Sequence, residues 1–192
     1  VWWCILYMPD ALIERIERFQ PTHKAFYAAQ ALIKSDYKHL DMLDAAWNTL
    51  LVNRLAYSGI VKANPLGGKN GSTEDLASRW NPKTLIKRIQ QIYQLAPRIE
   101  VSCIDAVEFI EQHFWDNEST IFVDPPYVQK GQALYTHYYT AEDHLQLAFV
   151  LRSLHYGTPC ADILVTYDYN EWINDVYYAT DSTEIISRCY SI

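Results

Sequence analysis

The stretch 121–127 constrains the fold of this chain more than any other. Its residues are Ile121, Phe122, Val123, Asp124, Pro125, Pro126 and Tyr127. The apolar run at its start is rich in β-forming residues and predicts a short buried strand. Two consecutive prolines cannot continue a helix and are confined to turns or to the edges of a sheet. We therefore expect Asp124 and Tyr127 in a stiff loop just past the carboxyl end of a strand, where open α/β sheets bind their ligands.

The groups in this loop suit one chemical task, which is the alkylation of an exocyclic amine on a purine. Such an amine is a poor nucleophile because its lone pair is delocalised into the ring. A protein can accept hydrogen bonds from the two N–H groups and leave the lone pair aimed at an electrophile. The carboxylate of Asp124 and the carbonyl of Pro125 are candidates for the two acceptors, and Tyr127 offers a ring on which a flipped base can stack. The other interpretation is a strand-ending turn with a capping acid.

The remaining pattern in the second half of the chain is one of strands alternating with helices. Strands are expected at 99–105, 163–168 and 185–190, and helices at 106–113, 140–155 and 171–176. Such alternation indicates a parallel α/β sheet. The helix at 140–155 has a capping box at its start, because Asp143 stands three residues after Thr140.

The first half of the chain reads as a helical packet followed by a loop. Helices are expected from Asp10 as N-cap to residue 19, then at 21–38, and then from about residue 40 to a stop at Gly59. Residues 53–81 are dominated by glycine, asparagine and lysine, which predicts a long loop or hairpin. Loops of this length in compact domains are usually functional. Asn81 and Pro82 then begin a further helix.

The charge is distributed unevenly along the chain. The net charge is −7, yet residues 53–98 carry eight Lys or Arg against two Asp or Glu. Residues 99–192 carry three basic and fifteen acidic side chains. A basic segment inside an acidic protein is a candidate surface for contacts with phosphates.

Several classes of protein are excluded by what the sequence lacks. The four cysteines, Cys4, Cys103, Cys160 and Cys189, are scattered, which predicts reduced thiols in a cytosolic protein. The six histidines form no cluster at metal-binding spacing, so we expect no metal site. No apolar run is long enough to cross a membrane, and no signal peptide is visible.

A resemblance to a known family begins at the Asp-Pro-Pro-Tyr stretch. Asp124, Pro125, Pro126 and Tyr127 after a hydrophobic strand resemble the catalytic signature of amino-group DNA methyltransferases. Lys130-Gly131, Leu134-Tyr135 and the run 137–144 resemble the continuation of that signature in Dam-like adenine-N6 methyltransferases. The resemblance implies transfer of a methyl group from S-adenosylmethionine (AdoMet) to N6 of an adenine flipped out of double-stranded DNA. It implies Asp124, Pro125, Pro126 and Tyr127 as catalytic residues.

The same resemblance implies a cofactor contact at Asp105 and a second at Asp124. In AdoMet-dependent enzymes with Rossmann-like sheets, the acid at the end of the corresponding strand commonly touches the adenine of the cofactor. Asp105 resembles that acid, but an acid that caps the next helix looks identical in sequence. Both interpretations of Asp105 stay open at this point.

Residues 53–64 resemble the stretch that opens the DNA-recognition hairpin of Dam-like enzymes. The resemblance implies that Tyr57 wedges into the duplex beside the flipped base. It implies DNA contacts for Arg54, Tyr57, Ser58, Ile60, Lys62 and Asn64. The chain departs from the family at Ser58 and Lys62, where Asn and Arg are frequent, and lysine cannot read guanine through two parallel hydrogen bonds as arginine does. The DNA sequence that is recognised therefore stays open.

The fold implied by the resemblance is a Rossmann-like AdoMet methyltransferase sheet with an inserted helical DNA-recognition subdomain. We divide the chain into a mainly helical target-recognition region at 1–98, with its basic loop at 53–81, and a catalytic α/β part at 99–192. A glycine-rich loop after the first strand and an acid after the second, both typical of the family, are not found. We therefore expect an incomplete sheet in a chain truncated at both ends, poorly stable alone and weak in binding AdoMet.

Other functions are compatible with the same residues. Methylation of cytosine N4 or of RNA uses the same proline and aromatic pattern, and a catalytically incomplete DNA-binding fragment also fits. The expected setting is the cytoplasm, with the protein encoded by a bacterium or a phage. In a restriction-modification system the cellular partner is a restriction endonuclease, and the oligomeric state stays open.

Overall fold

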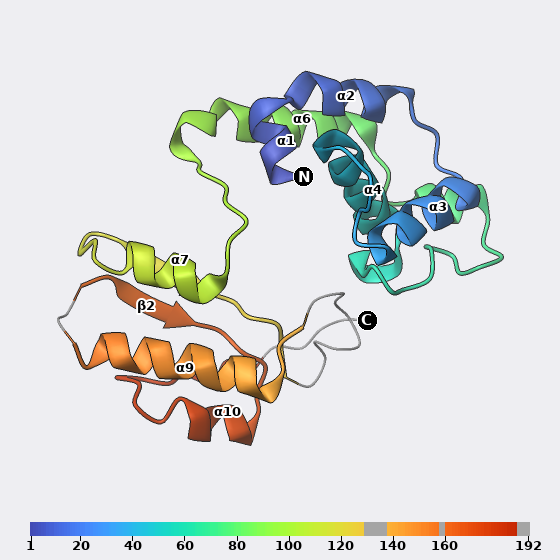
Figure 1. Cartoon of the computed structure of the whole chain (residues 1–192). Helices are drawn as coiled ribbons and strands as arrows, with labels where there is room; N and C mark the ends of the chain where they lie inside the picture. Colours follow the sequence, from blue (N-terminus) through green and yellow to red (C-terminus); the bar gives the residue numbers. More distant parts are fainter. Residues whose placement is uncertain (129–137, 158–159, 188–192) are drawn as a thin grey trace. The chain divides into compact units, whose positions relative to one another are not determined.

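The structure is a computed structural model that describes residues 1–128, 138–157 and 160–187. Two compact units are visible along the chain (Figure 1). The first spans Val1–Ser102, and the second contains the described residues from Cys103 onward. Each unit has a hydrophobic core of its own, and each is described separately below.

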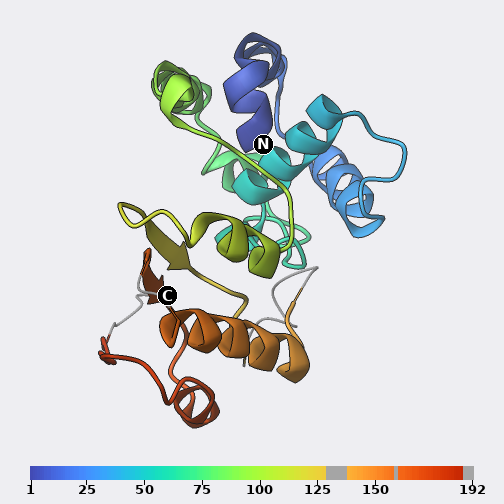
Figure 2. The same cartoon turned by 60° about the vertical axis from the view of Figure 1, so that its left-hand side comes forward.

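The regular structure of the first unit is helical. Its helices are α1 (Trp2–Tyr7), α2 (Pro9–Arg18), α3 (His23–Lys34), α4 (Met42–Leu55), α5 (Thr73–Ala77) and α6 (Pro82–Gln94), with 3-10 turns at Tyr57–Gly59 and Ala96–Arg98. Helix α2 packs against α6, and α3 packs against α4 (Figures 1 and 2). The apolar faces meet in one core whose most deeply buried members include Leu12, Ile16, Phe26, Leu55 and Leu76. The predicted helical packet is therefore observed.

Two helix starts in this unit show how capping depends on neighbouring residues. Asn81 caps α6 as expected, because its side chain accepts a hydrogen bond from the backbone N–H of Thr84 and Pro82 occupies the first turn. Asp10 does not cap α2, which corrects the expectation. Pro9 already occupies the first helical position there, so Asp10 lies in the first turn, where its negative charge faces the positive end of the helix.

The predicted helices at 21–38 and 40–59 are both shorter than expected. Helix α3 ends at Lys34, because Asp36 and Tyr37 take the left-handed conformation, with φ of 57° and 54°. An α-helix of L-residues cannot continue through that conformation. Helix α4 begins after its N-cap Asp41 and ends at Leu55, before the 3-10 turn that contains Gly59.

The described residues of the second unit form three helices and a two-stranded parallel sheet. Its elements are α7 (Ala106–His113), β1 (Thr120–Val123), α9 (Ala141–His155), β2 (Asp162–Val165) and α10 (Glu171–Val176). Ile121 stands opposite Ile163, and Val123 stands opposite Val165. The expected strand before the prolines and the expected helices at 106–113, 140–155 and 171–176 are confirmed. The described residues thus form a mixed α/β unit with a small parallel sheet.

Helices α7 and α9 cover one face of this sheet. Ile121 and Val123 are buried in the same core as Ile110 and Phe114 from the α7 region and Leu147 from α9. Successive strand residues point to opposite faces, so the residues between them face away from this core. On that other face Phe122 is 61% exposed and Leu164 is 53% exposed.

The predicted strand at 99–105 is not formed. Residues 99–105 carry no strand, and the two described strands pair with each other. Apolar alternation in a sequence does not reveal whether a partner strand is available, and a strand without partners lacks its interstrand hydrogen bonds. Residues 185–187 of the predicted last strand also carry no strand, while 188–190 and the stretch 130–137 lie outside the described residues.

The capping box of α9 gives a first testable prediction. Asp143 N–H donates to Thr140 Oγ1 at 3.3 Å, and Thr140 N–H donates to Asp143 Oδ2 at 2.7 Å. We expect Thr140→Ala to lower the free energy of unfolding by about 1 kcal/mol, because the N-terminal N–H groups of α9 lose an acceptor. Urea denaturation measures the loss. Thr84→Ala, at an exposed helical threonine that caps nothing, is the matched control, and an equal loss there would contradict the assignment.

Candidate functional site

The loop that follows β1 is held by a residue that follows β2. Asp124 Oδ1 accepts a hydrogen bond from Thr166 Oγ1 at 2.7 Å, and the Thr166 backbone N–H donates to the carbonyl of Val123 at 3.0 Å. The two strands are parallel, so their carboxyl ends lie at the same edge of the sheet. The sheet itself therefore brings Asp124 and Thr166 together.

In the described structure, Asp124 Oδ2 and the carbonyl of Pro125 are among the oxygen atoms of this loop that can accept further hydrogen bonds. Among the residues that the structure describes, Asp124 Oδ2 has no hydrogen-bond partner, and the carbonyl of Pro125 accepts no backbone N–H. Asp124 is exposed, Pro125 is buried, and Pro126 and Tyr127 are half-buried. The arrangement offers a fixed carboxylate and a carbonyl in a backbone stiffened by two prolines. Such a loop can receive the two N–H groups of an exocyclic amine.

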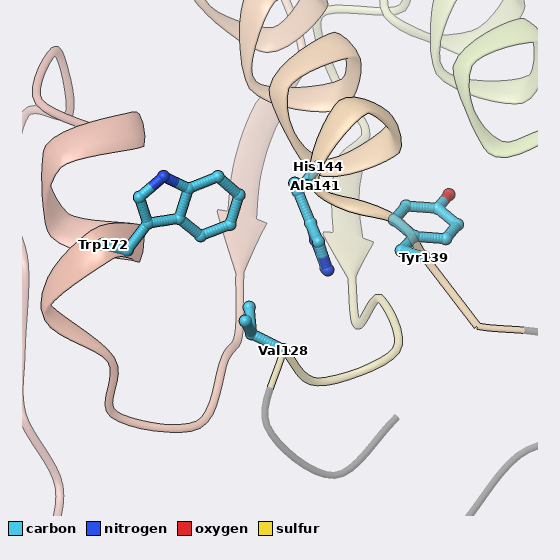
Figure 3. A pocket seen from close by; sticks show the side chains of 5 residues that line it. All are labelled: Val128, Tyr139, Ala141, His144 and Trp172. Atoms are coloured by element: carbon cyan, nitrogen blue, oxygen red, sulfur yellow. The ribbon is translucent and has the colours of Figure 1, made fainter. Parts of the chain in front are cut away.

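A cavity lies beside this loop (Figure 3). Its volume is about 270 Å³, and its lining residues are Val128, Tyr139, Ala141, His144 and Trp172. Val128 follows the Asp-Pro-Pro-Tyr stretch directly, Ala141 and His144 belong to the first turn of α9, and Trp172 belongs to α10. Burial raises the pKa of Tyr139, and the negative charges of Asp105 and Asp143 add to that effect.

Asp105 also has a structural role. Its Oδ1 accepts hydrogen bonds from the backbone N–H groups of Val107 at 2.8 Å and of Glu108 at 3.4 Å, so it is the N-cap of α7. Of the two interpretations left open by the sequence, the capping one is confirmed. A cofactor contact through the other carboxylate oxygen stays a prediction.

The predicted DNA-reading stretch forms a closed loop in the first unit. A bridge joins Ala56 to Pro65, and Tyr57 N–H donates to the carbonyl of Asn64 at 2.9 Å. At the turn, Ser58 and Gly59 have φ of 53° and 74°, which is the left-handed region. A side chain at Gly59 would also press against Asn53. The expected hairpin is thus a defined turn rather than an open loop. We call residues 56–65 the Tyr57 loop.

The side chains of the Tyr57 loop differ in accessibility. Tyr57 is 54% exposed at its turn, and Ser58, Lys62 and Asn64 are exposed as well. Ile60 is half-buried. Their contacts with DNA stay predictions, and their exposure is compatible with them.

Arg54 is directed toward the protein. Its Nε and Nη2 donate to the carbonyl of Arg79 at 3.2 and 2.7 Å, and Arg79 Nη1 donates to the carbonyl of Ala56 at 3.4 Å. Burial lowers the pKa of Arg54, and the positive charges of Arg79 and Arg88 add to the effect. Arg54 therefore holds Arg79, which in turn contacts Ala56 at the base of the Tyr57 loop. A contact between Arg54 and DNA stays a prediction.

Gln30 is a residue that the sequence did not single out. It lies on α3, is 8% exposed, and donates from its amide nitrogen to the carbonyls of Val61 at 2.7 Å and Ala63 at 2.9 Å. Its amide oxygen accepts from Lys34 Nζ at 3.3 Å. The side chain thus links α3 to the Tyr57 loop through two hydrogen bonds. No local pattern marks it, because its partners are more than thirty residues away.

The described residues give no sign of a metal centre or a membrane segment. They contain no group of three or more His, Cys, Asp or Glu side chains that could hold a metal ion. No helix in the described part of the chain is both long and apolar enough to span a membrane.

Comparison with known proteins gives one match that covers almost the whole chain. The model of the D12 class N6 adenine-specific DNA methyltransferase family matches residues 1–190. A search of curated proteins finds no match to this sequence. The matched segment includes both the Tyr57 loop and the Asp124 loop.

The hydrogen bonds from Gln30 to the Tyr57 loop give a second prediction. Gln30→Glu keeps the shape of the side chain but leaves only acceptors, so a carboxylate would face two carbonyl oxygens. We expect the free energy of unfolding to fall by about 1–3 kcal/mol, measured by urea denaturation. Gln90→Glu, at an exposed position of α6, is the control with the same change in charge. If the Gln30→Glu chain is as stable as that control, the hydrogen bonds of Gln30 contribute nothing to the free energy of unfolding.

Proposed function

The chain belongs to the D12 class N6 adenine-specific DNA methyltransferase family, and from that premise we propose that Asp124, Pro125 and Tyr127 form its catalytic centre, with AdoMet as the methyl donor. The activity of the family is methyl transfer to adenine N6 in DNA. The observation that carries the assignment is the state of Asp124. Thr166 holds one carboxylate oxygen at 2.7 Å, and the other has no partner in the described structure.

The first step of the proposed mechanism is the capture of a flipped adenine. Tyr127 stacks on the base, as aromatic side chains do in other proteins that extrude a base from the duplex. The N6 amine donates one hydrogen bond to Asp124 Oδ2 and the other to the carbonyl of Pro125. These two bonds draw the N–H groups into one orientation and leave the nitrogen lone pair facing away from the loop.

The second step is the transfer itself. AdoMet supplies an electrophilic methyl group on a sulfonium. Bound AdoMet would give this methyl group to the N6 lone pair and leave as S-adenosylhomocysteine. Asp124 would accept the proton that the amine loses, through its existing hydrogen bond. The protein acts by orientation and by fixed dipoles, and no covalent bond to the enzyme is formed.

Asp105 fits a cofactor of this kind in one respect. Asp105 is exposed, and only its Oδ1 is engaged in capping α7. The second oxygen can accept a hydrogen bond from an amine or a hydroxyl group, both of which AdoMet carries. We assign Asp105 and Asp124 as the cofactor contacts of this chain.

DNA binding is assigned to the first unit. The division of the structure between Ser102 and Cys103 supports a target-recognition region near 1–98 and a catalytic part near 99–192. Basic side chains concentrate in 53–98, and the Tyr57 loop offers an exposed aromatic ring with polar neighbours. We assign contacts with DNA to Arg54, Tyr57, Ser58, Ile60, Lys62 and Asn64.

Replacement of Asp124 tests the catalytic assignment. We expect Asp124→Ala to lower methyl transfer to duplex DNA by roughly 100-fold or more, because the amine loses a preorganised acceptor. Labelled methyl from AdoMet measures the rate, and analysis of the methylated nucleoside separates N6-methyladenine from N4-methylcytosine. DNA affinity, measured by fluorescence anisotropy, is expected to be unchanged. Asp162→Ala, at the far end of β2, is the control. Near-normal turnover of Asp124→Ala would refute the role.

Replacement of Thr166 tests how the carboxylate is held. Thr166→Val preserves the shape of the side chain and removes the hydroxyl that binds Asp124 Oδ1. We expect methyl transfer to slow about tenfold, because the carboxylate can then rotate away from the productive orientation. Thr183→Val, at an exposed threonine away from the loop, is the control for the same chemical change. Equal rates for the two variants would show that the Thr166 hydroxyl does not position Asp124.

A further inference from the structure

His144 has one ring nitrogen that nothing in the described structure satisfies. The residue is 1% exposed, and its Nδ1 lies 2.9 Å from the hydroxyl of Tyr167. Its Nε2 is buried and has no hydrogen-bond partner among the described residues. A buried polar atom without a partner is destabilising, so it calls for an explanation.

The neighbouring hydroxyl groups indicate which nitrogen carries the proton. Tyr167 is also 3.3 Å from the hydroxyl of Tyr177. If Tyr177 donates to Tyr167 and Tyr167 donates to Nδ1, both phenolic protons are used. In the reverse arrangement, the proton of Tyr177 has no acceptor among the described residues. We therefore place the proton of the neutral imidazole on Nε2, which makes this atom a hydrogen-bond donor.

His144 belongs to the wall of the cavity beside the Asp124 loop. Figure 3 shows a ring nitrogen of His144 directed toward the space bordered by Val128, with Tyr139 and Trp172 on either side. The His144 ring centre is 5.3 Å from that of Tyr139 and 5.9 Å from that of Trp172. A cavity with flat apolar walls and one donor suits a planar heteroaromatic ring that has an unprotonated nitrogen.

The same sheet edge supports the His144 ring, through Nδ1, and the Asp124 carboxylate. Thr166 and Tyr167 are consecutive residues after β2, and the first holds Asp124 while the second holds His144. Val128, which lines the cavity, follows Tyr127 directly. A base whose amine is bound by the Asp124 loop would therefore have its ring near His144.

We propose that His144 is a base-contacting residue, whose Nε2–H donates a hydrogen bond to a ring nitrogen of the flipped adenine. This inference rests on the proposed function and extends it, because it assigns recognition of the ring to a residue outside the Asp-Pro-Pro-Tyr stretch. Adenine has three unprotonated ring nitrogens, N1, N3 and N7, and one of them completes the hydrogen bonding of His144. The contact also satisfies the buried donor.

The charge state of His144 agrees with this role. Burial lowers the pKa of its imidazole, and the nearby carboxylates of Asp143 and Asp168 oppose that effect without reversing it. Around it, Tyr139, Tyr167 and Tyr177 all have a raised pKa because they are buried. The ring is therefore a neutral donor near pH 7, suited to a neutral base.

A titration with nucleosides tests the contact independently of turnover. The 192-residue chain, with its histidines labelled with ¹⁵N, is titrated with adenosine and with 1-, 3- and 7-deazaadenosine, each of which lacks one ring nitrogen. We expect adenosine to shift the Nε2 resonance of His144. One of the three analogues is expected to bind about tenfold more weakly than adenosine, which corresponds to about 1.4 kcal/mol.

Two variants complete the test as a thermodynamic cycle. His144→Phe keeps a flat ring without nitrogen, and we expect it to bind adenosine about tenfold more weakly and to lose the discrimination against that analogue. His144→Gln offers an amide N–H and is expected to recover part of the affinity. His113→Gln, at an exposed histidine of α7, is the matched control and is expected to behave as wild type. Circular dichroism confirms that each variant is folded.

Several results would overturn the proposal. An unchanged His144 resonance in saturating adenosine would do so, as would equal binding of all nucleosides by wild type and a folded His144→Phe. A shift caused by S-adenosylhomocysteine but not by adenosine would assign the cavity to the cofactor instead. Methyl transfer measured on the same wild-type preparation separates the two hypotheses. Transfer without an adenosine effect contradicts only the role of His144, and adenosine binding without transfer contradicts only the proposed function.

Discussion

The parallel pairing of β1 with β2 is the constraint on which the second unit depends. Parallel strands end at the same edge of a sheet, so the residues after Val123 and after Val165 are brought together even though some forty residues separate them in the chain. One pairing therefore sets two contacts, the hydroxyl of Thr166 on Asp124 and the hydroxyl of Tyr167 on His144. The buried face of the sheet fixes the register, because a slip by one residue would expose Ile121 and Val123 and bury the exposed Phe122.

The first unit holds the backbone of a turn in one conformation while the side chains of that turn stay exposed. The Tyr57 loop has a bridge at its base and two left-handed residues at its turn, and its carbonyls at Val61 and Ala63 are satisfied by the amide of Gln30. A loop held in this way loses little conformational entropy when it binds a partner. Exposed Tyr57 then gains the properties expected of a rigid aromatic anchor.

The sequence predicted the local features of both units well and the long-range ones poorly. The strand before Asp124 and the capping box at Thr140 could be read directly, because apolar runs, prolines and capping residues act over a few positions. The strand expected at 99–105 failed, since pairing depends on a neighbour that local propensity does not reveal. Asp10 was wrong as an N-cap because Pro9 already occupies the first helical position. Gln30 and the Tyr167 contact of His144 could not be predicted, because their partners lie far away in the sequence.

The charge distribution agrees with the proposed capture of a flipped base. Residues 99–192 carry fifteen acidic and three basic side chains, so the charge of this part of the chain disfavours contact with a phosphate backbone. Residues 53–98, with eight basic and two acidic side chains, carry the charge that attracts it. A neutral adenine can leave the duplex and approach the Asp124 carboxylate without bringing its phosphates to the same point. In the proposed mechanism the Asp124 carboxylate accepts an N6 hydrogen of a neutral base, while its acidic neighbours disfavour entry of the charged backbone. In this proposal, extrusion of the base allows an acidic site to act on DNA, while the basic segment 53–98 binds the phosphates.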